Sequence, residues 1–282
     1  MQNWLDFNQG VIWWQEPISW VVLAFGLLIG SFLNVCILRI PEKTFFLNSR
    51  SVCPHCQKGI PIYYNIPVFS WVMLRGKAAC CGGPISAMYP LVEGVTGVLF
   101  LLVYWKYPFV EPFTGRIAWD PVMFIQCMHM LMFTALMIVV SVIDLRLQII
   151  PDVISFPMIF LSSFWVFVHP QLDWFSSLSG VLFGGGILWV IAWVYYLVRK
   201  DYGLGFGDVK LLAAIGGWLG MEAVLPTLFL GSILGAIIGI VLIMLPGKKG
   251  LKTKIPFGPF LAIGALVHMF LGPNILHYAL LF

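Results

Sequence analysis

The sequence predicts an all-α polytopic membrane protein with about eight transmembrane helices and a cytosolic loop subdomain that carries cysteines. Composition and repeated apolar runs are the two observations behind this prediction. Hydrophobic residues make up 60% of the 282 residues and charged residues only 10%, whereas soluble domains carry roughly 25% charged residues. Apolar runs of the ~20 residues that cross a bilayer core also recur along the whole chain.

Eight apolar segments account for the expected transmembrane helices. One of them, at 209–222, is short and rich in glycine, so we expect a tilted or partly re-entrant helix there. The first segment lies too far from the N-terminus, and lacks the basic flank, to resemble a cleaved signal peptide. The eight segments are residues 18–38, 88–105, 122–143, 153–168, 176–198, 209–222, 224–245 and 256–281.

The positions of the basic residues predict how the chain is oriented. Lys and Arg in short loops are retained in the cytosol. With the loop after the first segment placed inside, 14 of the 16 basic residues fall on the cytosolic side, and only Lys106 and Arg116 fall outside. The expected topology therefore has both termini outside and one large cytosolic loop near residues 39–87.

The chain divides into two predicted parts. Residues 1–110 hold the first segments and the basic loop, and residues 111–282 form a compact six-helix unit with short connections. Glycines recur along the late segments, three in succession at 184–186 and three at four-residue spacing over 231–239. Such small-residue stripes let membrane helices approach closely, so we expect helix packing there.

Two aspartates lie where apolar segments meet the cytosol. Asp144 ends one segment and Asp208 opens a later segment from the same side, 64 positions further on. Acidic residues at such positions are costly and usually functional. Two aspartates that share a site cannot both ionise at low cost, so one can act as an acid while the other activates water, as in aspartic proteases.

Simpler interpretations of these acids remain open at this point. Asp208 precedes an apolar stretch and could cap a helix, and Asp152, which follows a proline, reads even more simply as a helix cap. Ion pairs with Arg146 or Lys210 are a further alternative. Asp152 could also replace Asp144 in the carboxylate pair, because spacing does not exclude it.

Four cysteines in the cytosolic loop form a second group. Cys53 and Cys56 make a CxxC turn, and Cys80 and Cys81 follow in the same loop. Four thiolates from two short turns suit tetrahedral zinc, and a cytosolic location argues against a stable disulfide. The second half is CC rather than CxxC, so His55 or water could complete the zinc shell, and reduced thiols without metal are the alternative.

Glu93 is an acid just inside the second apolar segment. An intramembrane carboxylate is functional by default, and a pair with a basic loop residue is the competing interpretation.

Several motifs in a fixed order resemble the type IV prepilin leader peptidases, a family of GxGD membrane aspartic peptidases. The GxGD-like stretch runs from Gly205 to Asp208 and is followed by Lys210, and the resemblance covers roughly residues 26–265. The matching segments are 30–35, 65–67, 89–93, 143–152, 205–210 and 255–262.

This resemblance implies which residues act. Asp144 and Asp208 would be the peptidase carboxylates, which selects Asp144 over Asp152. Gly205, Gly207 and Lys210 would be supporting motif residues.

It also implies a methyltransferase-associated region at Glu93 and the cytosolic loop. The family's loop carries two CxxC pairs, whereas this chain has Ala78 where the third cysteine would stand and Cys80 nearby.

The implied function is a bifunctional enzyme of the bacterial inner membrane. It would cleave the basic leader of prepilins or pseudopilins of type IV pilus or type II secretion systems on the cytosolic side. It would then N-methylate the exposed residue with S-adenosylmethionine. The expected partners are these substrates and lipid, with no nucleic acid. There are two alternatives: a peptidase without methyltransferase activity, like the preflagellin peptidases, and an ion-coupled transporter. The sequence lacks the inverted repeat that is typical of transporters, which counts against the second.

Overall fold

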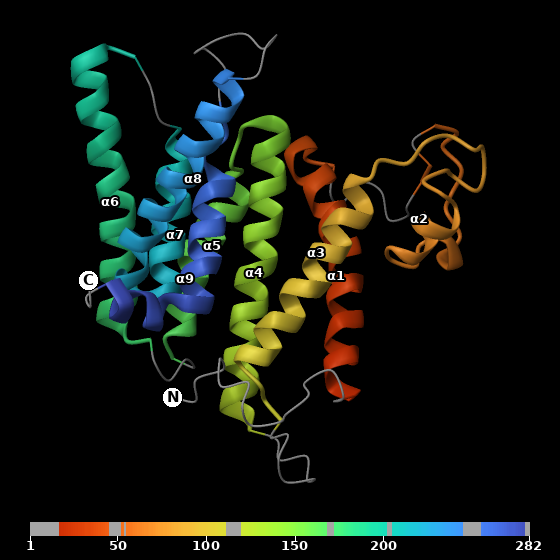
Figure 1. The fold of residues 1–282 in the computed structure, drawn as a ribbon, viewed down its shortest axis with the longest axis horizontal. Helices are drawn as coiled ribbons and strands as arrows, with labels where there is room; N and C mark the ends of the chain where they lie inside the picture. Colours follow the sequence, from red (N-terminus) through yellow and green to blue (C-terminus); the bar gives the residue numbers. More distant parts are fainter. Residues whose placement is uncertain are drawn as a thin grey trace. The chain divides into compact units, whose positions relative to one another are not determined.

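The computed structural model describes residues 17–44, 52–53, 55–110, 120–167, 172–201, 205–244 and 255–279. Within these ranges the chain is helical, without a β-strand beyond two isolated bridges, so the predicted all-α class is confirmed (Figure 1). The α-helices are α1 (Pro17–Glu42), α2 (Phe69–Met73), α3 (Met88–Lys106), α4 (Pro121–Leu147), α5 (Asp152–Trp165), α6 (Trp174–Arg199), α7 (Phe206–Leu219), α8 (Val224–Met244) and α9 (Gly258–Ala279).

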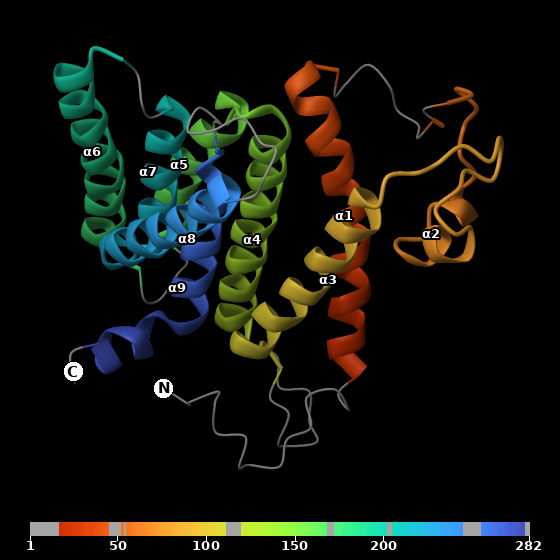
Figure 2. The same ribbon diagram turned by 45° about the horizontal axis from the view of Figure 1, so that its top comes forward.

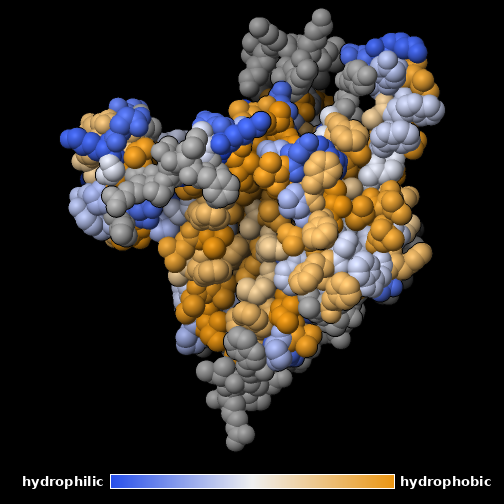
Figure 3. Space-filling model, turned by 180° about the vertical axis from the view of Figure 1, so that it is seen from behind, coloured by the Kyte–Doolittle hydropathy of each residue, from blue (hydrophilic) through white to orange (hydrophobic). Residues whose placement is uncertain are grey.

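Five described helices are long and apolar enough to cross a membrane. They are α1, α3, α4, α6 and the stretch Met221–Leu242, which includes most of α8. The eight predicted segments correspond to α1 and α3–α9, but α5 and the apolar part of α9, Gly258–Gly272, are shorter. Helix α7 has 14 residues, about 21 Å of helix against a hydrocarbon core of ~30 Å. Exposed hydrophobic side chains cover much of the helical surface in Figure 3.

The chain forms two compact units, residues 1–139 and 140–282. In the first unit, α1 and α3 lie side by side and run in opposite directions (Figure 2). Ser19, near the start of α1, accepts a hydrogen bond from Trp105, near the end of α3. Further along α1, the backbone at Gly30 contacts Glu93, near the start of α3. A Cβ added at Gly30 would lie 2.6 Å from the Glu93 Cα. Glycine therefore sets the close spacing of this α1–α3 hairpin.

In the second unit, α7 is the central helix. Most of its residues from Val209 to Trp218 are buried, although its sequence is too short for a typical span. The backbones of α6 and α7 touch at Gly180 and Gly216, where an added Cβ on either side would overlap the other's carbonyl. The Trp218 indole N–H donates to the Met158 carbonyl of α5 at 2.7 Å, so α7 is held on two sides.

The predicted role of the late glycines is borne out at two positions. Gly184 lies against the α7 backbone at Leu212, and Gly231 on α8 lies against the α9 backbone at Phe260. A side chain at Gly186, by contrast, would meet nothing within 4 Å. Packing thus explains part of the pattern.

Candidate active site and cysteine cluster

Asp144 lies near the end of α4 and is 5% exposed. Its Oδ2 accepts a hydrogen bond of 2.9 Å from the backbone N–H of Gly258, the first residue of α9. The first N–H groups of a helix have no partner within the helix and favour an anion. A Cβ at Gly258 would lie 2.7 Å from that oxygen, so glycine is what lets the backbone approach the carboxylate.

Asp208 is the third residue of α7 and also lies beside a helix start. Gly205 is the N-cap of α7, and the Asp208 carboxylate accepts a backbone hydrogen bond from it. Asp208 and Asp144 are close enough to interact electrostatically. The structure therefore brings together the two carboxylates that the sequence predicted as a pair.

Ile150, in the connection between α4 and α5, explains how the Asp144 and Asp208 carboxylates come together. An added Cβ at Gly207 would lie 2.9 Å from the Ile150 Cβ, and one at Gly258 would lie 3.3 Å from the Ile150 Cδ1. The starts of α7 and α9 thus both close onto one isoleucine side chain. Gly205 has φ −73° and ψ 137°, a conformation open to other residues, so close packing at Gly207, and not unusual backbone angles, accounts for the motif.

Asp152 takes a different partner. It forms an ion pair with Lys210, and the Asp152 side chain is 61% exposed against 13% for Lys210. The Lys210 ammonium also lies over the rings of Phe156, at 5.3 Å, and Phe206, at 5.4 Å, from the ring centroids. Through these contacts, Lys210 joins the first turn of α7 to the first turns of α5.

Neither Asp152 nor Asp208 is the N-cap of its helix, so the interpretation of these residues as helix caps is wrong. The N-cap of α5 is Pro151 and that of α7 is Gly205. A capping aspartate does occur in this chain at Asp173, whose Oδ1 accepts the Ser176 N–H at 2.8 Å.

The cysteine-bearing segment, residues 52–87, contains two turns of the same construction. In the first, the Cys53 N–H donates to Lys58, and in the second the Ala78 N–H donates to Gly83. Each turn then closes at a residue of positive φ, 58° at Gln57 and 70° at Gly82. By this register, Ala78 occupies the position of Cys53, and Cys81 that of Cys56.

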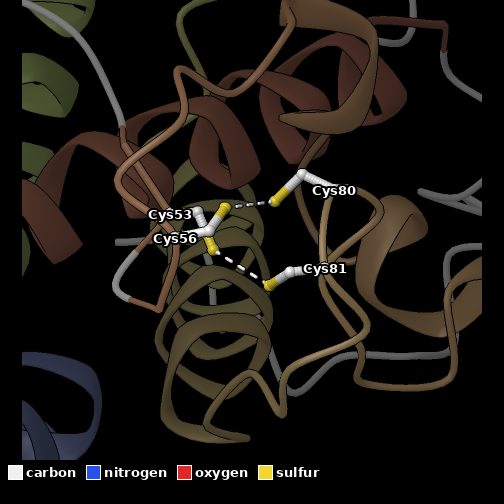
Figure 4. A group of neighbouring side chains, drawn as sticks. All are labelled: Cys53, Cys56, Cys80 and Cys81. Atoms are coloured by element: carbon white, nitrogen blue, oxygen red, sulfur yellow. Dashed lines mark hydrogen bonds between the residues drawn. The ribbon is translucent and has the colours of Figure 1, made fainter.

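The four thiols nevertheless converge (Figure 4). Their sulfur atoms all lie within 4.8 Å of one another, with 3.7 Å between Cys53 and Cys81 and 3.2 Å between Cys56 and Cys80. Tetrahedral zinc with Zn–S bonds of ~2.3 Å needs sulfur separations of about 3.8 Å. The donor set therefore fits zinc, with Cys80 supplying the thiol that Ala78 lacks.

Hydrogen bonds shift the pKa values of Cys53 and Cys80 in opposite directions. Backbone N–H groups of Cys56 and His55 lower the pKa of the Cys53 thiol to about 6. Hydrogen bonding to Cys56 and Cys53 raises the pKa of Cys80 to about 12. The His55 Nε2 lies 2.9 Å from the Pro84 carbonyl, so His55 joins the two turns and does not enter the sulfur cluster.

Glu93 lies elsewhere in the first unit, 8% exposed on α3. Its Oε2 accepts the backbone N–H of Val68 at 2.7 Å. Among the described residues, the partners of Glu93 are this backbone N–H and the Ser31 side chain, and not the basic loop residue of the competing interpretation.

Sequence reasoning missed Gly258, Ile150 and Val68. The stretch around Gly258 was recognised as a family motif, and a glycine at a helix start is a signal for close backbone approach. Ile150 lies in the matching segment 143–152, but nothing there indicates that it packs against α7 and α9, and nothing in the local sequence identifies Val68.

The fold and the carboxylate pair define a class, that of helical membrane proteins with two interacting aspartates at helix starts and ends. Residues 24–107 match the bacterial peptidase A24 N-terminal domain, and residues 131–240 match the type IV leader peptidase family. The chain belongs to the type IV leader peptidase family.

Curated relatives match over nearly their whole length. The prepilin leader peptidase/N-methyltransferase of Stutzerimonas stutzeri is 34% identical over 92% of this chain and 93% of its own. The protein of the same name from Aeromonas hydrophila is 34% identical over 98% and 97%, and that from Pseudomonas aeruginosa is 32% identical over 92% and 93%. No solved structure matches the chain.

Proposed function

We propose that this protein is a prepilin leader peptidase that also N-methylates its cleaved product. The observation that carries the peptidase half is that Asp144 and Asp208 lie within electrostatic range of each other, beside the starts of α7 and α9, which both pack against Ile150. The near full-length similarity to proteins named for both activities supports the pairing of peptidase and methyltransferase.

In the proposed reaction, the two aspartates share one proton. The ionised carboxylate removes a proton from water as the water oxygen attacks the scissile carbonyl. The protonated carboxyl then donates its proton to the leaving nitrogen, the C–N bond breaks, and a carboxylic acid and an amine result. The Gly258 N–H and the α7 terminus hold the two carboxylates in place, and Lys210 fastens the helix that carries Asp208.

The substrate class is proposed from the relatives, which are named for prepilin leader cleavage. A prepilin carries a basic leader followed by an apolar helix, and basic segments stay in the cytosol. The proposal therefore places the carboxylates at the cytosolic face of the bacterial inner membrane, with about eight spans and both termini outside. Prepilins and pseudopilins enter from the lipid, and nucleic acid is not a partner.

Methyl transfer is proposed for the region around Glu93 and the cytosolic cysteine-bearing segment, within residues 1–110, with peptide cleavage in residues 111–282. S-adenosylmethionine would supply an electrophilic methyl group to the new amino terminus.

Zinc is proposed as a structural ion held by Cys53, Cys56, Cys80 and Cys81. The sulfur separations support this, and a thiolate set without a water position is typical of structural zinc. Its contribution would be to stabilise the fold of a segment that has little core of its own.

Co-expression with a prepilin tests both activities. Intact-mass analysis of the pilin should show loss of the leader and gain of one methyl group. A full-length pilin would contradict the peptidase, whereas a cleaved and unmethylated pilin would favour the alternative of a peptidase alone. Solute flux in proteoliposomes without cleavage would favour the transporter, which no observation here supports.

A further inference from the structure

Glu93 is a buried acid that peptide cleavage does not use. Its carboxylate is engaged by the Val68 N–H at 2.7 Å and by the Ser31 side chain. An N–H bonded to a carboxylate is among the stronger hydrogen bonds in proteins. The contact joins α3 to a residue 25 positions earlier, in the cysteine-bearing segment.

The donor residue has an unusual backbone. Val68 adopts φ 59° and ψ −49° at the N-cap of α2, a region that β-branched residues rarely occupy. Such conformations persist only where the surroundings fix them. The Val68 N–H points to Glu93 in this conformation, which ties the unusual angles to the carboxylate.

Close contacts between α1 and α3 hold Glu93 in place. The α1 backbone at Gly30 lies against the Glu93 Cα, and one turn away the Asn34 Nδ2 donates to the Tyr89 carbonyl at 3.1 Å. The α1–α3 hairpin therefore presents the carboxylate from a rigid support.

The cysteine-bearing segment, in contrast, is small and mostly exposed. Its internal contacts include a bond of 3.1 Å from the Trp71 indole to the Ile85 carbonyl, and the side chains of Phe69, Val72 and Met73 are all more than half exposed. Segments below about 40 residues rarely hold a fold by their core alone. Such a segment needs attachment points, of which the Glu93–Val68 bond is one.

We propose that Glu93 is a positioning residue whose carboxylate, by holding the Val68 N–H, fixes the cysteine-bearing segment on the α1–α3 hairpin for methyl transfer. This rests on the proposed methyltransferase function. Transfer between two bound molecules depends on their alignment, and misplacement by about 1 Å can cost 10²-fold in rate. Leader cleavage, whose carboxylates lie in residues 140–282, should depend on this bond much less.

Three variants of the full-length protein in membranes test this. Glu93→Gln keeps an oxygen that can accept the Val68 N–H, and Glu93→Leu has none. Val68→Pro leaves α3 unchanged but removes both the donor and the φ of 59°, which proline cannot adopt. Glu93→Leu and Val68→Pro should lower the methylated fraction of a cleaved pilin about tenfold or more and speed tryptic cleavage at Arg75 and Lys77. Glu93→Gln should retain most methylation and wild-type protection from trypsin.

Ser19→Ala is the matched control, because it removes a hydrogen bond at the other end of the same hairpin and should change neither readout. If Glu93→Gln loses methylation as fully as Glu93→Leu while trypsin protection is unchanged, Glu93 takes part in the chemistry and the proposal is overturned. Unchanged protection in both Glu93→Leu and Val68→Pro would overturn it too. A wild-type protein that cleaves without methylating would refute the methyltransferase function instead, and the tryptic comparison would still test the attachment.

Discussion

In residues 140–282 the two aspartates are 64 positions apart in the sequence. They meet because the start of α9 at Gly258 reaches Asp144, and because Gly207 and Gly258 both pack against Ile150. In residues 1–139 the four thiols come from two short turns that each close within six residues. The first site therefore depends on glycines that let backbones touch, and the second on local hydrogen bonds within turns. A substitution in a distant helix should disturb the carboxylates, whereas the thiols should respond only to changes in their own turns.

The largest expected effect is at the carboxylates. Asp144→Asn or Asp208→Asn should lower leader cleavage by about 10²–10⁴-fold, because each variant removes either the base or the proton donor. Quantitative intact-mass analysis of co-expressed prepilin measures this. Asp152→Asn is the matched control and should keep cleavage within a few-fold of wild type, since Asp152 pairs with Lys210; a loss as large as that of Asp144→Asn would mean that Asp152 belongs to the pair.

A smaller effect is expected from the glycine that supports Asp144. Gly258→Val would place a Cβ 2.7 Å from the Asp144 Oδ2 and displace that carboxylate, so cleavage should fall about 10–10²-fold. The same cleavage assay applies, with the zinc content per chain expected to stay at the wild-type level.

Gly186→Val serves as its control, because an added Cβ at that position has nothing within 4 Å. Equal losses for Gly186→Val and Gly258→Val would remove the link between the glycine and the carboxylate.

The smallest effect is expected where a thiol is moved between equivalent turn positions. The reference for complete loss is Cys53→Ser, which should largely abolish bound zinc, measured by elemental analysis of the purified protein. The double variant Ala78→Cys/Cys80→Ser restores the pattern of the first turn and should bind zinc as wild type does. Zinc loss in this double variant would show that the two turns are not equivalent in binding metal.

The sequence was sufficient for the all-α class and for the positions of the helices. It also predicted Asp144 and Asp208 as a pair, with Asp144 chosen over Asp152 by the family resemblance. The class and the helix positions depend on hydrophobicity, and the expectation that both aspartates face one side depends on a topology rule that uses only charge. The alternative for Asp152 could not be resolved from sequence, because Lys210 lies on another helix and its direction depends on packing.

The supporting contacts were beyond the sequence for the same reason. Gly258 matters through the proximity of Asp144, and Val68 matters through an N–H whose direction follows from an unusual φ. Ala78 was recognised as a departure from the family pattern, yet only the paired turns show that Cys80 reaches the cluster from the neighbouring position. These contacts depend on how the helices and turns align in three dimensions, which the pattern of hydrophobic residues does not specify.

The most direct test of the account is whether Asp144 and Asp208 act as one unit. Cleavage rates of the two single Asn variants and of the double variant should be compared in the same membranes by intact-mass analysis. We expect the double variant to be no slower than the slower single variant, because groups that act together lose their function once. A double variant slower by the product of both single effects would mean that the two carboxylates act independently, which contradicts a shared site.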